Sequence, residues 1–442
     1  MKPELKNTAS PIEGLEKILD SVIAQEGLFI TGRAGTGKST LLRWIAAQQQ
    51  GKCVVVAPTG ISAINIGGVT IHSFFGLPAK PLGPQDPDIK RFGKNSPKGK
   101  LLQKTEWIII DEISMVRADL LDAIDFSLRL NTEQLHLPFG GKKMIFIGDL
   151  FQLEPVVQNS ELEQVMFSQY YDTPYFFSAK VFEQFDFRLL ELTKVHRQSD
   201  PYFINLLDSI RLNEAGQAEL EALNERVNSP SFDSAEEYTI VLTTTNASAN
   251  TLNELRLKQL TGDEQLYFSK MTGQFNANQI PAENVLRLKV GAQVVFLKND
   301  PLKRWMNGTL GYVTILSHED VVVKLEDGTE HTVQQSIWEN NVFYWDEKTN
   351  RIATNTIGTF AQLPIKLAWA ITIHKSQGLT FDKVKIDLGA GAFAHGQAYV
   401  ALSRCRTLEG ITLKRPIQYR DVIVDERIIN YMDSVRRKRI RL

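Results

Sequence analysis

A glycine-rich stretch near the start of the chain constrains its fold more than any other feature. The residues Gly32-Arg33-Ala34-Gly35-Thr36-Gly37-Lys38-Ser39 fit the pattern GxxxxGK[ST]. They directly follow the apolar run 28–31 and precede a helical pattern through Leu41, Leu42 and Ile45. A phosphate-binding loop joins a strand to a helix in this way, because backbone N–H groups and the helix N-terminus then point at the same phosphates. The stretch therefore predicts an α/β domain that binds a nucleotide.

Two side chains of this loop carry the expected chemistry. Lys38 is placed to reach the β- and γ-phosphates of ATP, and Ser39 is placed to ligate Mg²⁺ through its hydroxyl. ATP and Mg²⁺ are therefore the expected cofactors. A glycine turn with a chance lysine is the alternative, and the strand and helix on either side argue against it. The residues expected to contact the nucleotide are Gly32, Ala34, Gly35, Thr36, Gly37, Lys38, Ser39 and Thr40.

Polar side chains follow two further apolar runs. Asp111 and Glu112 come directly after the run 107–110, at the strand end where open α/β sheets bind ligands. Asp111 would hold Mg²⁺ through its water shell, and Glu112 would accept a proton from the attacking water. Gln152 follows the run 144–147 and could sense the γ-phosphate or orient water. On spacing alone, a surface glutamine explains Gln152 as well.

Length and hydropathy patterning indicate several units. The 442 residues give about three domains at roughly 150 residues each. Short apolar runs alternate with helical stretches over 27–147, which is typical of a parallel sheet covered by helices. Residues 78–104 are basic and too rich in proline for a helix, which suggests an inserted subdomain or an exposed arm. A second α/β pattern has strands at 238–242, 366–369 and 384–387, and the strands and turns of 286–345 predict a small inserted β-barrel.

Composition bears on the cellular location of the protein and on its partners. Two distant cysteines, Cys53 and Cys405, provide neither a disulfide framework nor a zinc motif. The N-terminal residues lack a signal-peptide pattern and no run of 18 apolar residues occurs, so we expect a cytoplasmic protein without membrane contact, associated with the nucleoid if bacterial. The net charge is -1, and basic residues gather mainly in 80–104 and in the tail 436–441. Such runs alone predict little about nucleic acid.

Taken together, the motifs resemble those of superfamily 1 helicases, and specifically the PIF-type (petite integration frequency) helicases related to RecD. The matching stretches are Ala57–Ala63, Thr70–Phe75, Ile110–Met115, Asp119–Val156, Leu192–Gln198, Ala370–Gly378 and Tyr399–Arg404. The resemblance covers about residues 15–415. The sequence departs from the family at Glu154, where proline is usual, and it lacks a clear upstream glutamine motif for adenine.

The resemblance implies an ATP-driven motor that moves 5′ to 3′ on single-stranded DNA. It implies two RecA-like P-loop domains: residues 1–190, carrying the arm, and residues 191–285 with 346–425. The barrel and a basic tail at 426–442 complete the chain. The resemblance also makes Gln152 a γ-phosphate sensor, adds Gly378 to the ATP-binding residues, and places Arg197 and Arg404 at the family's two arginine positions. Both arginines would stabilise the transition-state charge when ATP closes the cleft between the domains.

A motor of this kind has to hold DNA with each domain separately. In the first domain the expected contacts come from small and hydroxyl residues, which donate to phosphates without reading sequence. Phe74 could stack a base, although core packing is the alternative. The threonines before Asn246 could equally cap the helix that follows them. The expected DNA-binding residues are Pro58, Thr59, Gly60, Ser62, Ala63, His72, Ser73, Phe74, Thr244, Asn246, His374, Lys375 and Ser376.

The expected partners are single-stranded DNA and junctions of single-stranded with duplex DNA, bound by a monomer. We expect the arm to act as a wedge at the junction and the barrel as a clamp. The preferred structured DNA, whether a fork, a G-quadruplex, an R-loop or a recombination intermediate, stays open. Two alternatives are an ATP-switched nucleic-acid-binding or loader module and an inactive subunit of a larger complex. Only a motor needs both arginines and two DNA grips, and Lys38, Asp111 and Glu112 are all present.

Overall fold

A computed structural model describes most of the chain. The described residues are 27–49, 51–157, 161–227, 238–275 and 280–440. The first 26 residues of the expected first domain and the last two residues of the tail lie outside these ranges. In the described ranges, none of the helices combines the length and the apolar character that crossing a membrane requires.

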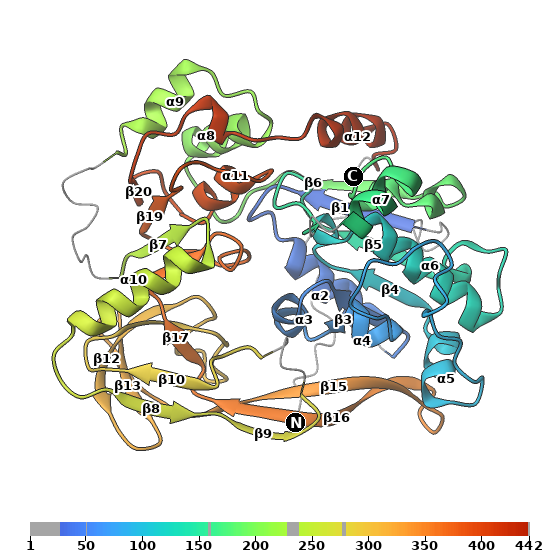
Figure 1. Cartoon of the computed structure of the whole chain (residues 1–442), viewed down its shortest axis with the longest axis horizontal. Coiled ribbons are helices and arrows are strands. Elements are labelled where there is room, and N and C mark those ends of the chain that lie inside the picture. Colours follow the sequence, from blue (N-terminus) through green and yellow to red (C-terminus); the bar gives the residue numbers. More distant parts are fainter. Residues whose placement is uncertain (1–26, 50, 158–160, 228–237, 276–279, 441–442) are drawn as a thin grey trace.

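The first lobe is built on a six-stranded parallel sheet in the order β3-β2-β4-β5-β1-β6 (Figure 1). The four apolar runs expected as strands are confirmed, and two strands are added at the edges. All four central runs are buried along their length, as strands covered by helices on both faces must be. The strands are β1 Gly27–Gly32, β2 Cys53–Ala57, β3 Val69–Thr70, β4 Trp107–Ile110, β5 Lys143–Ile147 and β6 Arg188–Leu192.

Helices pack around this sheet and complete two hydrophobic clusters. Helix α2 buries Leu41, Leu42 and Ile45 against β1 and β4, while α6 buries Leu121 and Ile124 in the other cluster. These i, i+3 and i+4 spacings are those of one helix face. The helices of this lobe are α2 Lys38–Gln48, α3 Gly60–Ile66, α4 Ile71–Phe75, α5 Pro97–Lys104, α6 Ala118–Thr132 and α7 Glu161–Tyr170.

The arm at 78–104 is partly helical, so the expectation that it contains no helix is wrong. Helix α5 has Pro97 in its first turn. The N–H groups of a first turn have no acceptor within the helix, so proline, which lacks an N–H, loses no hydrogen bond there. Ser96 caps the helix by accepting a hydrogen bond from Gly99 N–H at 3.0 Å. Buried Leu82 and Ile89 anchor the irregular part of the arm in the core of the lobe. The arm is therefore a fixed projection rather than a loose loop.

The second lobe has a four-stranded parallel sheet in the order β18-β7-β19-β20. The run 366–369 was expected as one of its strands, but its first two residues belong to β17, which pairs antiparallel with β11 of the insertion, and its last two connect β17 to β18. The chain leaves one sheet and enters the other within a continuous apolar run, so hydropathy does not mark the change. The elements are β7 Ile240–Thr243, β18 Ala370–Thr372, β19 Val384–Asp387, β20 Ile411–Leu413, α8 Pro201–Arg211, α9 Gln217–Asn224, α10 Asn246–Gln259 and α11 Gln397–Leu402.

An antiparallel insertion interrupts the second lobe and is longer than the expected 286–345. It runs from β8 to β17 and contains sheets of five, three and two strands. The hairpin β15–β16 extends from it to the arm, where Lys100 pairs with Glu347 (Figure 1). The strands are β8 Gln265–Phe268, β9 Lys270–Gly273, β10 Val285–Leu288, β11 Gln293–Phe296, β12 Leu310–Leu316, β13 Val321–Leu325, β14 Glu330–Val333, β15 Ser336–Asp346, β16 Arg351–Gln362 and β17 Ile365–Leu367.

The expected basic tail is folded onto the first lobe. Helix α12, Glu426–Arg436, buries Ile428, Met432 and Val435 in the core of that lobe. Beyond it, Ile440 N–H donates to Leu189 O of the edge strand β6 at 2.8 Å. The sequence was interpreted as a tail because charged residues dominate it, although its buried apolar residues recur at helical spacing. This segment therefore connects the second lobe back to the first.

Candidate nucleotide and DNA sites

The phosphate loop has the backbone geometry that its glycines allow. It leaves the end of β1 and enters α2, with Gly35 and Gly37 at φ 78° and 86°. A Cβ on Gly35 would lie 2.4 Å from Cβ of Arg197, so a side chain there would collide with the segment after β6. His196 N–H also donates to Gly35 O at 2.8 Å. The loop and the Arg197 segment are therefore packed together.

Lys38 lies at the first turn of α2 and faces the loop. Its Nζ donates to the carbonyls of Gly32 at 2.6 Å and Arg33 at 2.9 Å. Burial lowers the pKa of Lys38, although the charges of Asp149 and Glu112 act in the opposite direction. Ser39 and Thr40 are exposed to the same side, while Thr36 is buried and donates to Arg33 O at 2.9 Å. An incoming phosphate would replace these carbonyl contacts of the lysine with a charge pair.

The acidic pair follows β4 directly, as expected from the sequence. Burial raises the pKa of Asp111, and burial together with the charge of Asp111 raises the pKa of Glu112 to about 7. Glu112 has a left-handed backbone, φ 50°, which re-aims its side chain away from the strand direction. A carboxylate with a pKa near neutrality is suited to accept a proton from water.

Two glutamines bridge the lobes beside this carboxylate. Gln377 Nε2 donates to Glu112 Oε2 at 3.2 Å and to Gln152 Oε1 at 3.3 Å. Gln152 Nε2 donates to Asp149 Oδ2 at 3.3 Å. Gln377 stands in one of the matched motifs, but nothing in its spacing singled it out. The structure thus places Gln152 near the acidic pair and adds Gln377 to the site.

The Arg197 side chain extends from the segment beside the phosphate loop toward Arg404, which lies on the opposite wall of the same cleft. Arg404 is 1% exposed, and its guanidinium donates to Val400 O at 2.9 Å and Ser403 Oγ at 2.8 Å. Arg197 Nη1 donates to Ser403 O at 2.9 Å. Burial and the charge of Arg197 lower the pKa of Arg404. Over the ranges that the structure describes, neither arginine pairs with a carboxylate, so both are available to an anionic ligand.

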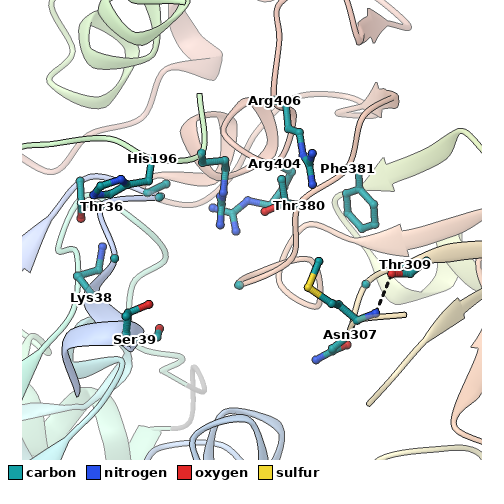
Figure 2. A pocket seen from close by; sticks show the side chains of 18 of the residues that line it. Thr36, Lys38, Ser39, His196, Asn307, Thr309, Thr380, Phe381, Arg404 and Arg406 are labelled. Atoms are coloured by element: carbon teal, nitrogen blue, oxygen red, sulfur yellow. Dashed lines mark hydrogen bonds between the residues drawn. The ribbon is translucent and has the colours of Figure 1, made fainter. Parts of the chain in front are cut away.

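Most of these groups, though not Asp111, Asp149 or Gln377, line one cavity of about 1060 Å³ between the lobes. Figure 2 shows Thr36, Lys38 and Ser39 on one side and Arg404, Arg406 and Thr380 on the other. A loop of the insertion, with Asn307 and Thr309, forms a third wall beside Phe381 (Figure 2). Gly35, Glu112, Gln152, Arg197 and Gly378 also line the cavity. Its size and mixed charge suit a nucleoside triphosphate.

The donor set at this site also fits a magnesium ion. The described residues contain no group of three or more His, Cys, Asp or Glu side chains that could hold a metal alone. The Ser39 hydroxyl and the Asp111 carboxylate are hard oxygen donors, and Mg²⁺ commonly takes one or two such protein ligands together with phosphates and water. Asp111, 7% exposed at the end of β4, makes no ion pair in the described ranges.

The first candidate DNA surface is a groove between α3, α4 and the hairpin β15–β16. Gly60, Ala63 and Ser73 line a cavity of about 370 Å³ opposite Trp338 and Asn340. Thr59 caps α3 by accepting from Ser62 N–H at 3.2 Å, so its hydroxyl is partly engaged. Pro58, Ser62 and His72 are half-buried nearby, and burial lowers the pKa of His72. The groove has hydroxyl donors, among them the exposed Ser73.

Two residues expected to bind DNA, Phe74 on the first lobe and Ser376 on the second, have buried side chains. Phe74 is 1% exposed and packs edge-on against Phe75 with ring centroids 4.8 Å apart, so it belongs to the core. Ser376 is fully buried and its hydroxyl donates to Ile373 O at 2.7 Å. Both expectations are wrong, because each side chain points into its own lobe.

The second candidate DNA surface lies on the second lobe. Thr245 caps α10 by accepting from Ser248 N–H at 3.2 Å, while Asn246 is exposed and Thr244 half-buried. Lys375 is exposed, and burial lowers the pKa of the neighbouring His374. Burial and the charge of Lys375 lower the pKa of Lys366 to about 8. The charge of Glu283 acts in the opposite direction, and nothing in the strand pattern of 365–367 singled out Lys366.

Comparison with known proteins gives one consistent match. Residues 10–219 match the family model described as PIF1-like helicase. The chain is 33% identical to ATP-dependent DNA helicase Pif1 of Bdellovibrio bacteriovorus, over 93% of this chain and 89% of that protein. It is 34% identical to human ATP-dependent DNA helicase PIF1, over 96% of this chain and 63% of that protein. The chain therefore spans less than two thirds of the human relative.

Solved structures agree with this match. Bacteroides sp Pif1 in complex with ADP-AlF4 superposes with a TM-score of 0.88 and 39% identity, covering 98% of both chains. Bacteroides Pif1 bound to single-stranded DNA superposes with a TM-score of 0.70 and 40% identity, covering 97% of both chains. The shared fold confirms the expected arrangement of two RecA-like lobes with inserted subdomains.

Proposed function

This chain belongs to the PIF1-like helicase family of ATP-dependent DNA helicases, and we propose that it uses ATP hydrolysis to move 5′ to 3′ along single-stranded DNA and separate duplexes. One observation carries the proposal. The phosphate loop of the first lobe faces Arg404 and Gly378 of the second lobe across a single cavity. A triphosphate bound there would attract both walls, so its hydrolysis would change the distance between the lobes.

The roles of the residues follow from their places in the cleft. Lys38 and the loop N–H groups would bind the β- and γ-phosphates, and Glu112 would accept the proton of the attacking water. Ser39 and Asp111 would hold Mg²⁺, which when bound neutralises phosphate charge. Gln152 would contact the γ-phosphate, while Arg197 and Arg404 would stabilise the charge that develops on it.

The residues proposed to hold the strand come from both lobes, as stepwise movement requires, although the hairpin β15–β16 also lines the first groove. Gly60, Ala63 and Ser73 would hold phosphates on the first lobe, and Lys375 would do so on the second. Opening and closing of the cleft would then move one grip relative to the other. We place the arm at the junction as a wedge and the insertion over the strand as a clamp. Because residues of one chain complete the cleft, we propose that a monomer suffices.

An unwinding assay with 5′-tailed, 3′-tailed and blunt duplexes tests the proposal directly. We expect ATP-dependent strand separation of the 5′-tailed duplex only, with none by a Lys38→Ala variant. An ATP-switched binder or loader would bind the tails and separate no strands. Preference for 3′ tails would leave the motor intact but overturn the polarity. Adding a G-quadruplex to the duplex substrates would test that proposed partner in the same assay.

A further inference from the structure

A buried polar network crosses the interface between the lobes behind the phosphate loop. Asp149, at 1% exposed, follows β5 in the first lobe. Arg211, 4% exposed at the end of α8, donates from Nη2 to Asp149 Oδ1 at 2.9 Å. Tyr399, 3% exposed on α11, brings its hydroxyl to 3.5 Å from Asp149 Oδ2. One carboxylate of the first lobe is thus held by two side chains of the second.

The Tyr399 hydroxyl also touches the phosphate loop itself. Ala34 N–H donates to Tyr399 Oη at 2.9 Å, across 365 positions of sequence. The oxygen is therefore the acceptor for Ala34, and its proton is free to point at Asp149. Burial raises the pKa of Tyr399, so the hydroxyl keeps that proton at neutral pH. A single hydroxyl thereby links the loop to the carboxylate.

Asp149 in turn holds the residue expected at the γ-phosphate. Gln152 Nε2 donates to Asp149 Oδ2 at 3.3 Å, on the same oxygen that Tyr399 approaches. Burial acts to raise the pKa of Asp149, but the charges of Arg211 and Lys38 outweigh it and keep the carboxylate ionised. The position of the Gln152 amide therefore depends on how Asp149 is oriented.

We propose that Tyr399 is a positioning residue through which the second lobe sets both the phosphate loop, at Ala34, and the Gln152 amide, by way of Asp149. The proposal rests on the proposed ATPase function. When the γ-phosphate of ATP attracts the Gln152 amide, that amide moves away from Asp149. The Asp149 carboxylate then keeps only its contacts with Arg211 and Tyr399 among these three side chains. Movement of α11 with its lobe is then transmitted to the phosphate loop through one hydroxyl.

A purely stabilising role does not account for this arrangement. Burying an ion pair costs desolvation that apolar packing of the same shape avoids. Within the described part of the chain, Arg211 Nε is buried without a hydrogen-bond partner, which adds to that cost. The network also joins two lobes that have to move relative to each other, rather than parts of one core. We therefore infer that the network couples the movements of the two lobes.

The test is Tyr399→Phe, which removes the hydroxyl and keeps the ring. We expect kcat of the ssDNA-stimulated ATPase to fall about tenfold, as expected for one lost hydrogen bond to a positioned group, with the KM for ATP within about twofold of wild type. The ratio of the ATPase rate with ssDNA to the rate without ssDNA should also fall. Tyr267→Phe is the matched control, since Tyr267 is 3% exposed and its hydroxyl donates to Ser317 O at 2.7 Å inside the insertion. It should leave kcat and the ratio unchanged.

Asp149→Asn provides a second, nearly isosteric variant. If Tyr399 acts through Asp149, the double variant should lose no more than the worse single variant. Unchanged kcat and stimulation in Tyr399→Phe, or a lower melting temperature alone, would overturn the inference. So would fully multiplicative effects in the double variant. Wild-type protein without ssDNA-stimulated ATPase would instead overturn the proposed function, which separates the two failures.

Discussion

At the scale of single residues, the protonation state of Glu112 should set the pH dependence of hydrolysis. A general base has to be deprotonated, and the pKa of Glu112 is raised to about 7 by burial and by Asp111. We therefore expect kcat/KM, which reports groups of the free enzyme, to rise about tenfold between about pH 6 and about pH 8. Steady-state ATPase assays over this range measure it. A profile flat down to pH 5 would mean that another group accepts the proton.

Gln377 offers an internal check on that assignment. Its amide donates to Glu112, and a donor to a carboxylate favours the charged form. A Gln377→Leu variant should therefore shift the acid limb of kcat/KM to higher pH. DNA affinity measured over the same range controls for a general effect of pH on binding.

Arg404 should matter for the chemical step rather than for ATP binding. An arginine that stabilises transition-state charge contributes about 10³ to 10⁵ in rate. We expect Arg404→Ala to lower kcat by at least about 10³ while a fluorescent ATP analogue still binds. The exposed Arg420 provides the control, and Arg420→Ala should retain wild-type kcat. A loss of analogue binding equal to the loss of kcat would contradict this role.

The residues that sequence predicted are those whose chemistry is local. The loop Gly32–Ser39 and the pair Asp111-Glu112 follow strands directly, so their positions are fixed within a few residues. Gln377, Lys366 and Arg211 acquire their surroundings from segments far away in the chain, which no spacing records. Phe74 shows the converse, because an aromatic beside hydroxyl residues fits both a DNA surface and a core.

At the scale of elements, hydropathy found the strands but not their partners. The central strands of both lobes lie within a few residues of their predicted places. Whether 365–372 forms one strand or two depends on pairing with β11 and β7, which hydropathy does not encode. Helix α5 was missed because proline was counted as a breaker when it occupies the first turn.

The arm provides a test of the wedge. Residues 83–88 lie between the anchors Leu82 and Ile89, so their replacement by two glycines should spare the core of the lobe. We expect strand separation to be lost and ssDNA-stimulated ATPase to stay within about twofold of wild type, because the cavity does not include the arm. Gel-based unwinding beside ATPase measures both. Unwinding at the wild-type rate would refute the wedge.

The segment after α12 should stabilise the first lobe. Truncation after Arg437 removes two backbone hydrogen bonds with Leu189, of 3.2 Å and 2.8 Å, and the pairing of Arg439 with Glu191. Backbone bonds contribute about 1 kcal/mol each, so we expect the free energy of unfolding of this lobe to fall by about 2 kcal/mol. Urea unfolding followed by tryptophan fluorescence measures the change. An Arg436→Ala substitution, which removes ion pairs with Glu191 and Asp433 but no backbone hydrogen bond, should cost less than about 1 kcal/mol.

At the scale of the whole molecule, a net charge of -1 coexists with the proposed grip on a polyanion. The net charge of the whole chain does not predict DNA binding here, because carboxylates pair with many of the basic side chains away from the candidate surfaces. In the arm, Lys80 pairs with Asp88, and Arg91 and Lys94 pair with Glu133. Lys366 and Lys375 make no ion pair of 4 Å or less in the described ranges, although the charge of Glu283 acts on both. The local sign of charge therefore points to the second lobe as the stronger phosphate site.

The salt dependence of DNA affinity should reveal that local charge. For single strands, each neutralised phosphate contributes about -0.7 to the slope of log K against log salt. We expect Lys375→Gln to make the slope shallower by about 0.7 and to weaken binding equally for all sequences.

Lys366→Gln should add a comparable change only if its ammonium is charged at the assay pH. Since burial and Lys375 lower its pKa to about 8, its effect should shrink between about pH 7 and about pH 9. Lys180→Gln, on the first lobe beside Glu183, is the control and should leave the slope unchanged. Fluorescence anisotropy with labelled oligonucleotides measures all three variants, and an unchanged slope for Lys375→Gln would remove the second grip from the proposal.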